Sequence, residues 1–327
     1  MQPAPPILEV RDLCVEYATA GRPVGAVDHV SLDLGAGEFL AIVGESGCGK
    51  STLLFAIARL LSPPARVVAG AVRFKGRDML GMSERDLREV RWREFSVVMQ
   101  SAMNALNPVM TIGAQLGDAM TAHARLSARA VQDRSREVLR LIGIDPIHLR
   151  AYPHQLSGGM RQRAMIAMAL LFTPDLVIMA EPTSAVDVVA QRSLMVQIKE
   201  LQQQLGFAVL FVTHDMSLVS HFSDRLAVMY AGQVVEVGAT RTLFAAPQHP
   251  YTRGLMAAFP SIRGARQSLR GIPGTPPDLG DAPPGCRFHP RCPSMMDRCR
   301  SDPPVLAPVS QALVRCHLYD DDVPPQH

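Results

Sequence analysis

The residues with the clearest chemistry form an eight-residue segment near the N-terminus, Gly44-Glu-Ser-Gly-Cys-Gly-Lys-Ser. The spacing Gly-x-x-x-x-Gly-Lys-Ser is that of a phosphate-binding loop. Its glycines let backbone N–H groups point inward, where side chains would block the phosphates. Lys50 offers a mobile positive charge to the β- and γ-phosphates, and the Ser51 hydroxyl is placed to ligate Mg²⁺. The segment predicts a site for a nucleoside triphosphate.

The sequence around this loop has the elements that such a loop requires. Glu38–Val43 is apolar and rich in strand-forming residues, and Thr52–Ala58 has the composition of a helix, whose N-terminus adds a partial positive charge. The Cys48 side chain takes no part in this scheme, although a thiol reagent there would block the loop. The residues expected to bind ATP here are Gly44, Ser46, Gly47, Cys48, Gly49, Lys50, Ser51 and Thr52.

Two further apolar strands end in polar residues. Leu176–Met179 leads into Ala180-Glu181, and Ala208–Val212 leads into Thr213-His214. Functional groups of open α/β sheets gather at the carboxyl ends of the strands. A lone Glu or His is usually a surface residue, but two at strand ends in a chain with a phosphate loop favour a nucleotide site. We expect Lys50, Glu181 and His214 to converge.

A second glycine motif, Leu156-Ser-Gly-Gly-Met-Arg-Gln-Arg163, precedes a helix predicted over Met160–Leu171. With this motif, nearly the whole chain resembles the ATP-binding subunit of an ABC transporter. The resemblance implies a P-loop NTPase α/β fold with a RecA-like core, an antiparallel β subdomain and a helical subdomain, plus a Pro- and Cys-rich C-terminal extension. Ser-Gly-Gly at a helix N-terminus suits a γ-phosphate, and it cannot easily reach its own loop, so the site would be shared between two subunits.

The resemblance also implies roles for individual residues. Tyr17 would stack on adenine, although an aromatic residue in a strand is equally well explained as core. Gln100 would sense Mg²⁺ and couple to the membrane subunits, Glu181 would polarise the attacking water, and His214 would hold the γ-phosphate. Asp187 would lie in the loop that links two ATP sites. The contacts to the nucleotide of the opposite subunit would come from Ser157, Gly158 and Gly159.

One position departs from the family pattern. The residue before the catalytic Glu is normally an Asp that holds Mg²⁺ through a water molecule, and here it is Ala180. Mg²⁺ would then depend on Ser51, Gln100 and the phosphates, and losing such an outer-shell partner costs about 10–100-fold in metal affinity or activity. Three explanations stay open: a weak half of an asymmetric pair, a natural variant that compensates, or an engineered change.

The composition changes after about Phe259. Thirteen of the 26 prolines lie in the last 69 residues, which predicts an extended, loop-rich extension. It contains Cys286, Cys292, Cys299 and Cys316. Clustered thiols in a cytosolic chain indicate metal or redox chemistry more often than disulfides.

The spacing of these cysteines lacks the CxxC pairs of zinc ribbons. Four cysteines on irregular loops suit a [4Fe–4S] cluster, which this spacing alone does not establish; zinc and free thiols are the alternatives, with His289 and His317 as substitute ligands. The extension resembles the C-terminal region of oligopeptide and dipeptide importers, some of which carry an iron–sulfur cluster there. The segments that carry this resemblance are His249-Pro-Tyr-Thr-Arg-Gly-Leu255, Pro276-Pro, Gly285-Cys and His289-Pro-Arg-Cys.

Composition excludes several of the remaining classes of function. The apolar fraction is 47% and the net charge is +3, so nucleic acid is not the expected partner; Arg85–Arg93 and Arg125–Arg140 alternate with acidic residues, as solvated helix faces do. No apolar stretch approaches the ~18–20 residues that cross a bilayer, and the N-terminus is not a signal peptide. We expect a cytosolic protein that reaches a membrane only through partners.

These observations predict a nucleotide-binding domain over residues 1–258, with a helical subdomain at about 101–160, and an extension over 259–327. The resemblance implies an ATPase subunit at the cytoplasmic face of a bacterial inner membrane. It would power import of di- or oligopeptides with a second ATP-binding subunit, a paralogue, two permease subunits and an extracytoplasmic binding protein. Nickel or oligosaccharide cargo and a regulatory subunit that hydrolyses little are the alternatives. A soluble ABC ATPase of DNA repair or translation would carry coiled-coil insertions or tandem cassettes, which this chain lacks.

Overall fold

The computed structural model describes residues 5–99, 105–181, 188–258 and 271–322. The chain forms two compact units that alternate along the sequence. The first comprises Met1–Ile7, Leu34–Phe39 and Phe74–Phe211, and the second comprises Leu8–Asp33, Leu40–Arg73 and Val212–His327. The phosphate loop and the C-terminal cysteines therefore belong to the same unit.

The second unit contains two sheets. One has the order β2-β1-β4, and its strands are β1 (Leu8–Tyr17), β2 (Val24–Leu34) and β4 (Ala65–Phe74). The other has the order β11-β12-β10-β9-β3, and its strands are β3 (Phe39–Val43), β9 (Arg225–Tyr230), β10 (Gln233–Ala239), β11 (Leu306–Val309) and β12 (Ala312–Arg315). The helices of this unit are α1 (Lys50–Ile57), α8 (Met216–Phe222), α9 (Thr240–Ala245) and α10 (Pro250–Ala257).

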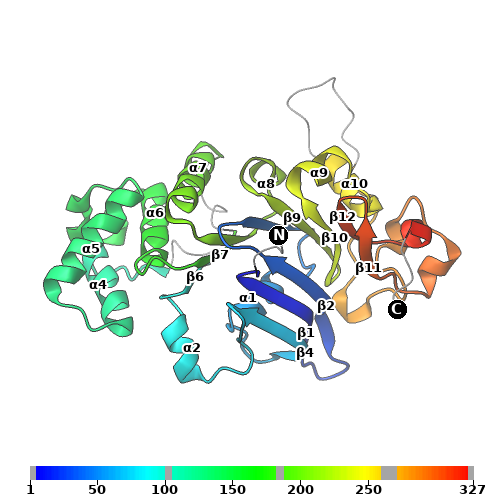
Figure 1. Cartoon of the computed structure of the whole chain (residues 1–327), viewed down its shortest axis with the longest axis horizontal. Helices are drawn as coiled ribbons and strands as arrows, with labels where there is room; N and C mark the ends of the chain where they lie inside the picture. The colour runs from blue at the N-terminus through cyan, green and yellow to red at the C-terminus, as the bar shows by residue number, and fades with distance from the viewer. Residues whose placement is uncertain (1–4, 100–104, 182–187, 259–270, 323–327) are drawn as a thin grey trace. The chain divides into compact units, whose positions relative to one another are not determined.

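The strand that leads into the phosphate loop lies inside its sheet. Every residue of β3 is buried, and β3 pairs in parallel with β9, with Val43 opposite Val228. A strand buried on both faces is a near-continuous apolar run, as Phe39–Val43 is. The sheet continues outward from β9 through antiparallel β10 to β12, where Glu236 lies opposite Val314 (Figure 1).

In the first unit the strand order is β8-β7-β6, and β6 and β7 pair in parallel. All residues of β7 and β8 are buried. The helices α4, α5 and α6 lie side by side (Figure 1), and α4 and α5 begin at Thr111 and Ser127, whose hydroxyls cap the first turn. The elements of this unit are β5 (Arg77–Asp78), α2 (Glu84–Val90), β6 (Phe95–Val98), α4 (Ile112–His123), α5 (Ala128–Leu141), α6 (Gly158–Ala169), β7 (Leu176–Ala180), α7 (Val188–Leu205) and β8 (Ala208–Val212).

The strands expected before the loop, before Glu181 and before His214 are confirmed. Two helices begin earlier than predicted, α1 at Lys50 and α6 at Gly158. The extension is less loop-like than expected, because β11 and β12 add to the sheet of β10. Over residues 271–322, the part of the extension that the structure describes, the remaining regular structure is four short 3₁₀ helices, at Leu279–Asp281, His289–Arg291, Asp297–Arg300 and His317–Asp322. The boundary at residue 258 stays a prediction.

Candidate functional site

The glycines of the phosphate loop are required by the protein around it. A Cβ atom on Gly44 would lie 2.2 Å from the carbonyl oxygen of Met229, and one on Gly49 would lie 2.1 Å from that of Ala26. Both positions also have positive φ, 157° and 99°. That side chains here would also block the phosphates stays a prediction; a Cβ on Gly47 would meet no protein atom within 4 Å. Gly44 and Gly49 instead allow neighbouring backbone to approach closely.

Lys50 is the first residue of α1 and is buried, with a relative exposure of 7%. Its ammonium donates hydrogen bonds to the carbonyl oxygens of Gly44 at 2.8 Å and Glu45 at 2.9 Å. Ser46 and Ser51 are exposed. The loop thus presents a lysine, hydroxyls and a helix N-terminus together, a combination that suits an anion such as a polyphosphate.

Cys48 is buried, with its Sγ 3.7 Å from the Lys50 ammonium. Burial raises the pKa of this thiol. Because the thiolate is the reactive form, a buried and protonated Cys48 is a poor target for thiol reagents. This geometry argues against the expectation that such reagents block the loop through Cys48.

Two other predicted nucleotide residues lie in the same unit as the loop. The Tyr17 hydroxyl is 3.0 Å from the Thr52 hydroxyl, so this half-buried ring stands beside α1. His214 is exposed, and the neighbouring Thr213 N–H donates to the Ile42 carbonyl at 3.2 Å, next to the strand end that opens the loop. Adenine stacking by Tyr17 and γ-phosphate binding by His214 stay predictions.

The remaining predicted residues lie in the first unit or outside the described residues. Glu181 directly follows β7, is half-buried and has φ +43°. Ala180 is 5% exposed at the carboxyl end of the strand. Gln100 and Asp187 fall outside the described residues. The convergence of Glu181 with the loop stays a prediction.

The Ser-Gly-Gly motif forms the N-terminus of α6. Ser157 is the N-cap, and its hydroxyl accepts a hydrogen bond from the Met160 N–H at 3.2 Å. Ser157 is exposed, and a Cβ on Gly159 would meet nothing within 4 Å. No acidic residue occupies the first turn, so this end of the helix suits an approaching anion.

Sequence reasoning missed the residues of the extension that contact the phosphate loop. Arg291 forms an ion pair with Glu45 at 2.7 Å, and the Glu45 N–H donates to the Tyr251 hydroxyl at 3.0 Å. Tyr251 is fully buried, and its ring lies 5.4 Å from that of Phe288. The sequence segments around His249 and His289 could have pointed to these contacts. They indicated only a resemblance to the C-terminal region of peptide importers.

The four cysteines of the extension are free thiols. Burial raises the pKa of Cys286 to about 11, and burial together with the charges of the other three cysteines raises the pKa of Cys316 to about 11. Among the described residues, which include all four, no three of these sulfur atoms lie within 4.8 Å of one another. The four thiols are close enough to interact electrostatically but are not drawn together around one point.

The two histidines of this region differ as substitute ligands. Both ring nitrogens of His317 are hydrogen-bonded, Nδ1 to Asp320 and Nε2 to the Asp302 carbonyl, each at 2.8 Å. The structure therefore argues against His317 as a metal ligand. His289 uses Nδ1 toward the Cys286 carbonyl at 3.0 Å.

Cys14, Asp28 and His29 place one ligand atom each within 4.8 Å of one another. Asp28 already pairs with Arg287 at 2.8 Å and accepts from the Gln233 amide at 2.7 Å. The adjacent guanidinium opposes a divalent cation there, so we assign no metal to this group.

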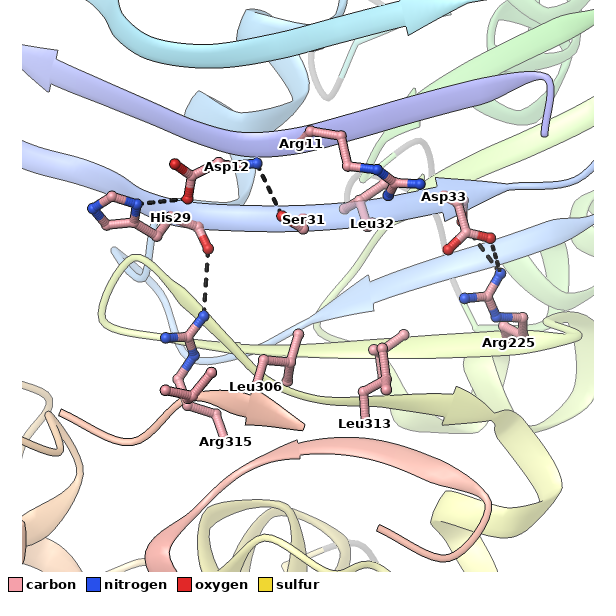
Figure 2. A pocket seen from close by; sticks show the side chains of 12 residues that line it. Arg11, Asp12, His29, Ser31, Leu32, Asp33, Arg225, Leu306, Leu313 and Arg315 are labelled. Carbon is pink, nitrogen blue, oxygen red and sulfur yellow. Dashed lines mark hydrogen bonds and ion pairs between the residues drawn. The ribbon is translucent and has the colours of Figure 1, made fainter. Parts of the chain in front are cut away.

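A separate cavity of about 420 Å³ lies in the second unit between β1, β2, β11 and β12 (Figure 2). Its charged residues pair with one another or with backbone: Arg225 with Asp33 at 3.1 Å, His29 with Asp12 at 2.6 Å, and Arg315 with the His29 carbonyl at 3.3 Å (Figure 2). Leu306 and Leu313 supply an apolar side. We assign no ligand to this cavity.

Within the described ranges, the helices are all too short or too polar to span a bilayer.

Comparison with known proteins finds relatives over nearly the whole chain. Residues 27–184 match the ABC transporter family, and residues 235–299 match the oligopeptide/dipeptide transporter C-terminal region. The dipeptide transport ATP-binding protein DppD of Bacillus subtilis is 44% identical over 96% of this chain and 95% of its own length. The oligopeptide transport ATP-binding protein OppD of Salmonella typhimurium is 42% identical over 94% of this chain and 92% of its own.

Solved structures agree with these relatives. The ATP-binding cassette MJ0796, seen as a dimer bound to ADP and Pi, superposes with a TM-score of 0.64 at 27% identity, covering 72% of this chain and 99% of that one. CbiO1 from Clostridium perfringens superposes with a TM-score of 0.64 at 26% identity, covering 74% of this chain and 92% of that one. The P-loop NTPase fold expected from the sequence is confirmed. The chain belongs to the ABC transporter family, among its dipeptide and oligopeptide transport ATP-binding proteins.

Proposed function

We propose that this protein hydrolyses ATP to power an ABC importer of di- or oligopeptides. The observation that carries the proposal is the phosphate loop, in which buried Lys50 and exposed Ser51 open α1, in one chain with a C-terminal region of the peptide-transporter type. The family membership supports the ATPase activity, and the relatives named for dipeptide and oligopeptide transport support the cargo.

The chemistry is phosphoryl transfer to water. Lys50 moves from its backbone carbonyls to the β- and γ-phosphates, and the loop N–H groups bind the remaining oxygens. Ser51, with Gln100, would hold Mg²⁺, and the ion would supply charge neutralisation for the phosphates. Glu181 orients the attacking water and His214 contacts the γ-phosphate. Ser157, Gly158 and Gly159 serve the nucleotide of a second subunit, because a helix N-terminus with an exposed Ser157 N-cap and no acidic residue in its first turn suits a γ-phosphate.

The proposed assembly contains this protein and a second ATP-binding subunit, a paralogue, with two permease subunits and an extracytoplasmic binding protein. It places the protein at the cytoplasmic face of the bacterial inner membrane. ATP closes the two ATP-binding subunits over shared sites, and hydrolysis reopens them. Ala180 favours one variant of this proposal, in which this subunit is the slower half of an asymmetric pair.

The test is transport by the full complex in vesicles that contain the permease and the loaded binding protein. We expect dipeptides or oligopeptides to stimulate ATP hydrolysis and to accumulate in the vesicles, and Lys50→Ala to abolish both. Stimulation by nickel or an oligosaccharide alone would refute peptide cargo. Hydrolysis that Lys50→Ala leaves unchanged would refute the catalytic assignment.

We also propose that Cys286, Cys292, Cys299 and Cys316 hold a [4Fe–4S] cluster. The sulfur ligands of one tetrahedral zinc lie about 3.8 Å apart, given Zn–S bonds of about 2.3 Å. The four thiols here are more widely spread than that, and a four-iron core holds its cysteine sulfurs farther apart than a single ion does. Such a group would fix loops that have little core of their own.

Anaerobic purification followed by iron, sulfide and zinc analysis tests this assignment. We expect about four irons and four sulfides per chain, with visible absorbance that is lost in Cys299→Ser. Stoichiometric zinc without iron would refute the cluster.

A further inference from the structure

The extension contacts the phosphate loop through an arginine that lies next to a cysteine. Arg291, in the 3₁₀ helix His289–Arg291, precedes Cys292. Its Nη1 lies 2.7 Å from Glu45 Oε2 and its Nη2 lies 3.0 Å from Glu45 Oε1, a bidentate pair. The Arg291 side chain is only 6% exposed and that of Glu45 24%. Such a pair is stronger and more directional than a surface ion pair.

The rest of the Arg291 guanidinium is fixed by backbone of the same extension. Its Nε donates to the Pro273 carbonyl at 2.7 Å, and Nη2 also contacts the Gly274 carbonyl at 3.3 Å. Its carbon lies 5.8 Å from the centre of the Tyr230 ring. The position of the guanidinium therefore depends on how the extension is folded.

Glu45 connects the Arg291 guanidinium to the phosphate loop. Its carboxylate binds Arg291, its N–H donates to Tyr251 at 3.0 Å, and its carbonyl oxygen accepts from Lys50 at 2.9 Å. One residue thus joins the extension to the lysine of the ATP site.

A second arginine beside a cysteine reaches the loop by another route. Arg287, which follows Cys286, pairs with Asp28 at 2.8 Å and donates to the Ala231 carbonyl. The next residue, Gly232, donates its N–H to the Cys48 carbonyl at 2.9 Å. The segment between Cys286 and Cys292 therefore supports the loop at two points.

The charge of Glu45 makes its ion pair with Arg291 important for ATP binding. Glu45 adjoins Gly44 in the loop, so an uncompensated carboxylate there would repel the polyphosphate. At the effective dielectric constant of about 20 that suits a partly buried site, this repulsion would weaken ATP binding on the order of tenfold. Arg291 cancels this charge and fixes the carboxylate.

We propose that Arg291 and Glu45 are positioning residues for ATP, through which the folded state of the cysteine-bearing extension sets the nucleotide affinity of the phosphate loop. This inference rests on the proposed binding of ATP by that loop. It adds regulation to that site: a change at the cysteines that displaces residues 286–292 lowers the affinity for ATP without touching Lys50 or Ser51.

The test is a mutant cycle on the full-length protein, read by equilibrium binding of ATP and ADP and by thermal unfolding. We expect Arg291→Gln to weaken ATP binding on the order of tenfold, and ADP binding less, because ADP carries less charge. Adding Glu45→Gln to Arg291→Gln removes the repelling charge and restores most of the affinity. Arg291→Lys keeps the charge without the bidentate geometry, so its ATP affinity should lie between those of the unchanged protein and Arg291→Gln.

The matched control is Arg298→Gln, which removes the ion pairs of an exposed arginine with Asp302 and Asp320 in the same extension and should leave ATP affinity unchanged. Unchanged affinity in Arg291→Gln would overturn the inference. A loss that Glu45→Gln does not restore, together with a lower melting temperature, would also overturn it, since that pattern indicates a structural role only. Lys50→Ala separates the two proposals: if it still binds ATP normally, the proposed ATP site is wrong.

Discussion

At the scale of single residues, Ala180 is the position where the site departs from its family. It ends a fully buried strand and is itself 5% exposed, so its methyl group faces protein and has no means of holding a ligand water. Glu181 beside it retains the carboxylate that the proposed chemistry needs. The protein should therefore turn over slowly and depend on Mg²⁺ concentration rather than lack activity altogether.

Restoring the missing carboxylate should reveal this dependence. We expect Ala180→Asp to raise ATP hydrolysis at low Mg²⁺ by about tenfold or more, and to change it little at saturating Mg²⁺, since an outer-shell partner of a metal is worth about 10–100-fold. The measurement is the hydrolysis rate against Mg²⁺ concentration. Ala180→Ser, which adds no charge, is the control. Superimposable Mg²⁺ curves for Ala180→Asp and the unchanged protein would contradict this account of Ala180.

At the scale of elements, α10 shows how a sequence segment noted for resemblance is explained by structure. His249 is the N-cap of α10, its Nδ1 accepts from the Tyr251 N–H at 3.0 Å, and Pro250 occupies the first turn. This cap aims the Tyr251 hydroxyl at the Glu45 N–H. The helix start was available from the His-Pro pattern, but the contact with the loop was not.

The buried cap makes the stability of the protein sensitive to acid. Burial lowers the pKa of His249 from 6.5 to about 3, so between these values the unfolded chain binds a proton that the folded chain does not. His249 thus contributes stability above pH 6.5, and this contribution is lost as the pH falls toward 3. At pH 4.5 the loss amounts to about 2–3 kcal/mol.

His249→Asn tests this, because Asn also caps helices but does not titrate. Between pH 7 and pH 4.5, we expect the melting temperature of the unchanged protein to fall further than that of His249→Asn. Glu236, Arg253 and Arg315, which face His249, are present in both proteins. Parallel melting curves against pH would show that His249 does not carry the acid sensitivity.

Sequence patterns predicted the elements around the ATP site because each of them is local. The loop, the apolar strands and the start of α6 are all encoded within runs of about ten residues. Strand β11 was missed because Leu306–Val309 contains Pro308, which argues against a central strand. It is tolerated because β11 ends the strand order, with Pro308 exposed. The pairing of Arg291 with Glu45 spans 246 residues and leaves no periodic signal.

At the scale of the whole molecule, the loop and the Ser-Gly-Gly motif belong to different units of the chain. A helix N-terminus with an exposed Ser157 N-cap suits the nucleotide of a neighbouring subunit, and the solved relative MJ0796 is described as a dimer. Each subunit would then need its partner for turnover but not for holding ATP.

Gly159→Asp should separate these two abilities. A carboxylate at the start of α6 repels the γ-phosphate of the neighbouring site, so we expect full ATP binding by the isolated protein and at least tenfold slower hydrolysis by the complex. Gly159→Ala adds no charge and its Cβ meets no atom of its own subunit within 4 Å, so it should slow hydrolysis less than Gly159→Asp. Weaker ATP binding by isolated Gly159→Asp would contradict a role for this motif in the partner's site.

The link between Glu45 and Arg291 also has a consequence for biosynthesis. The phosphate loop leaves the ribosome early, yet its Arg291 partner is made 246 residues later. At about 5–20 residues per second, that interval lasts about 12–50 seconds. During it a nascent chain has the loop sequence without the ion pair that holds it, and the extension must be synthesised before the loop is supported. The cell therefore obtains a fully supported ATP site only from chains that have been translated past Arg291.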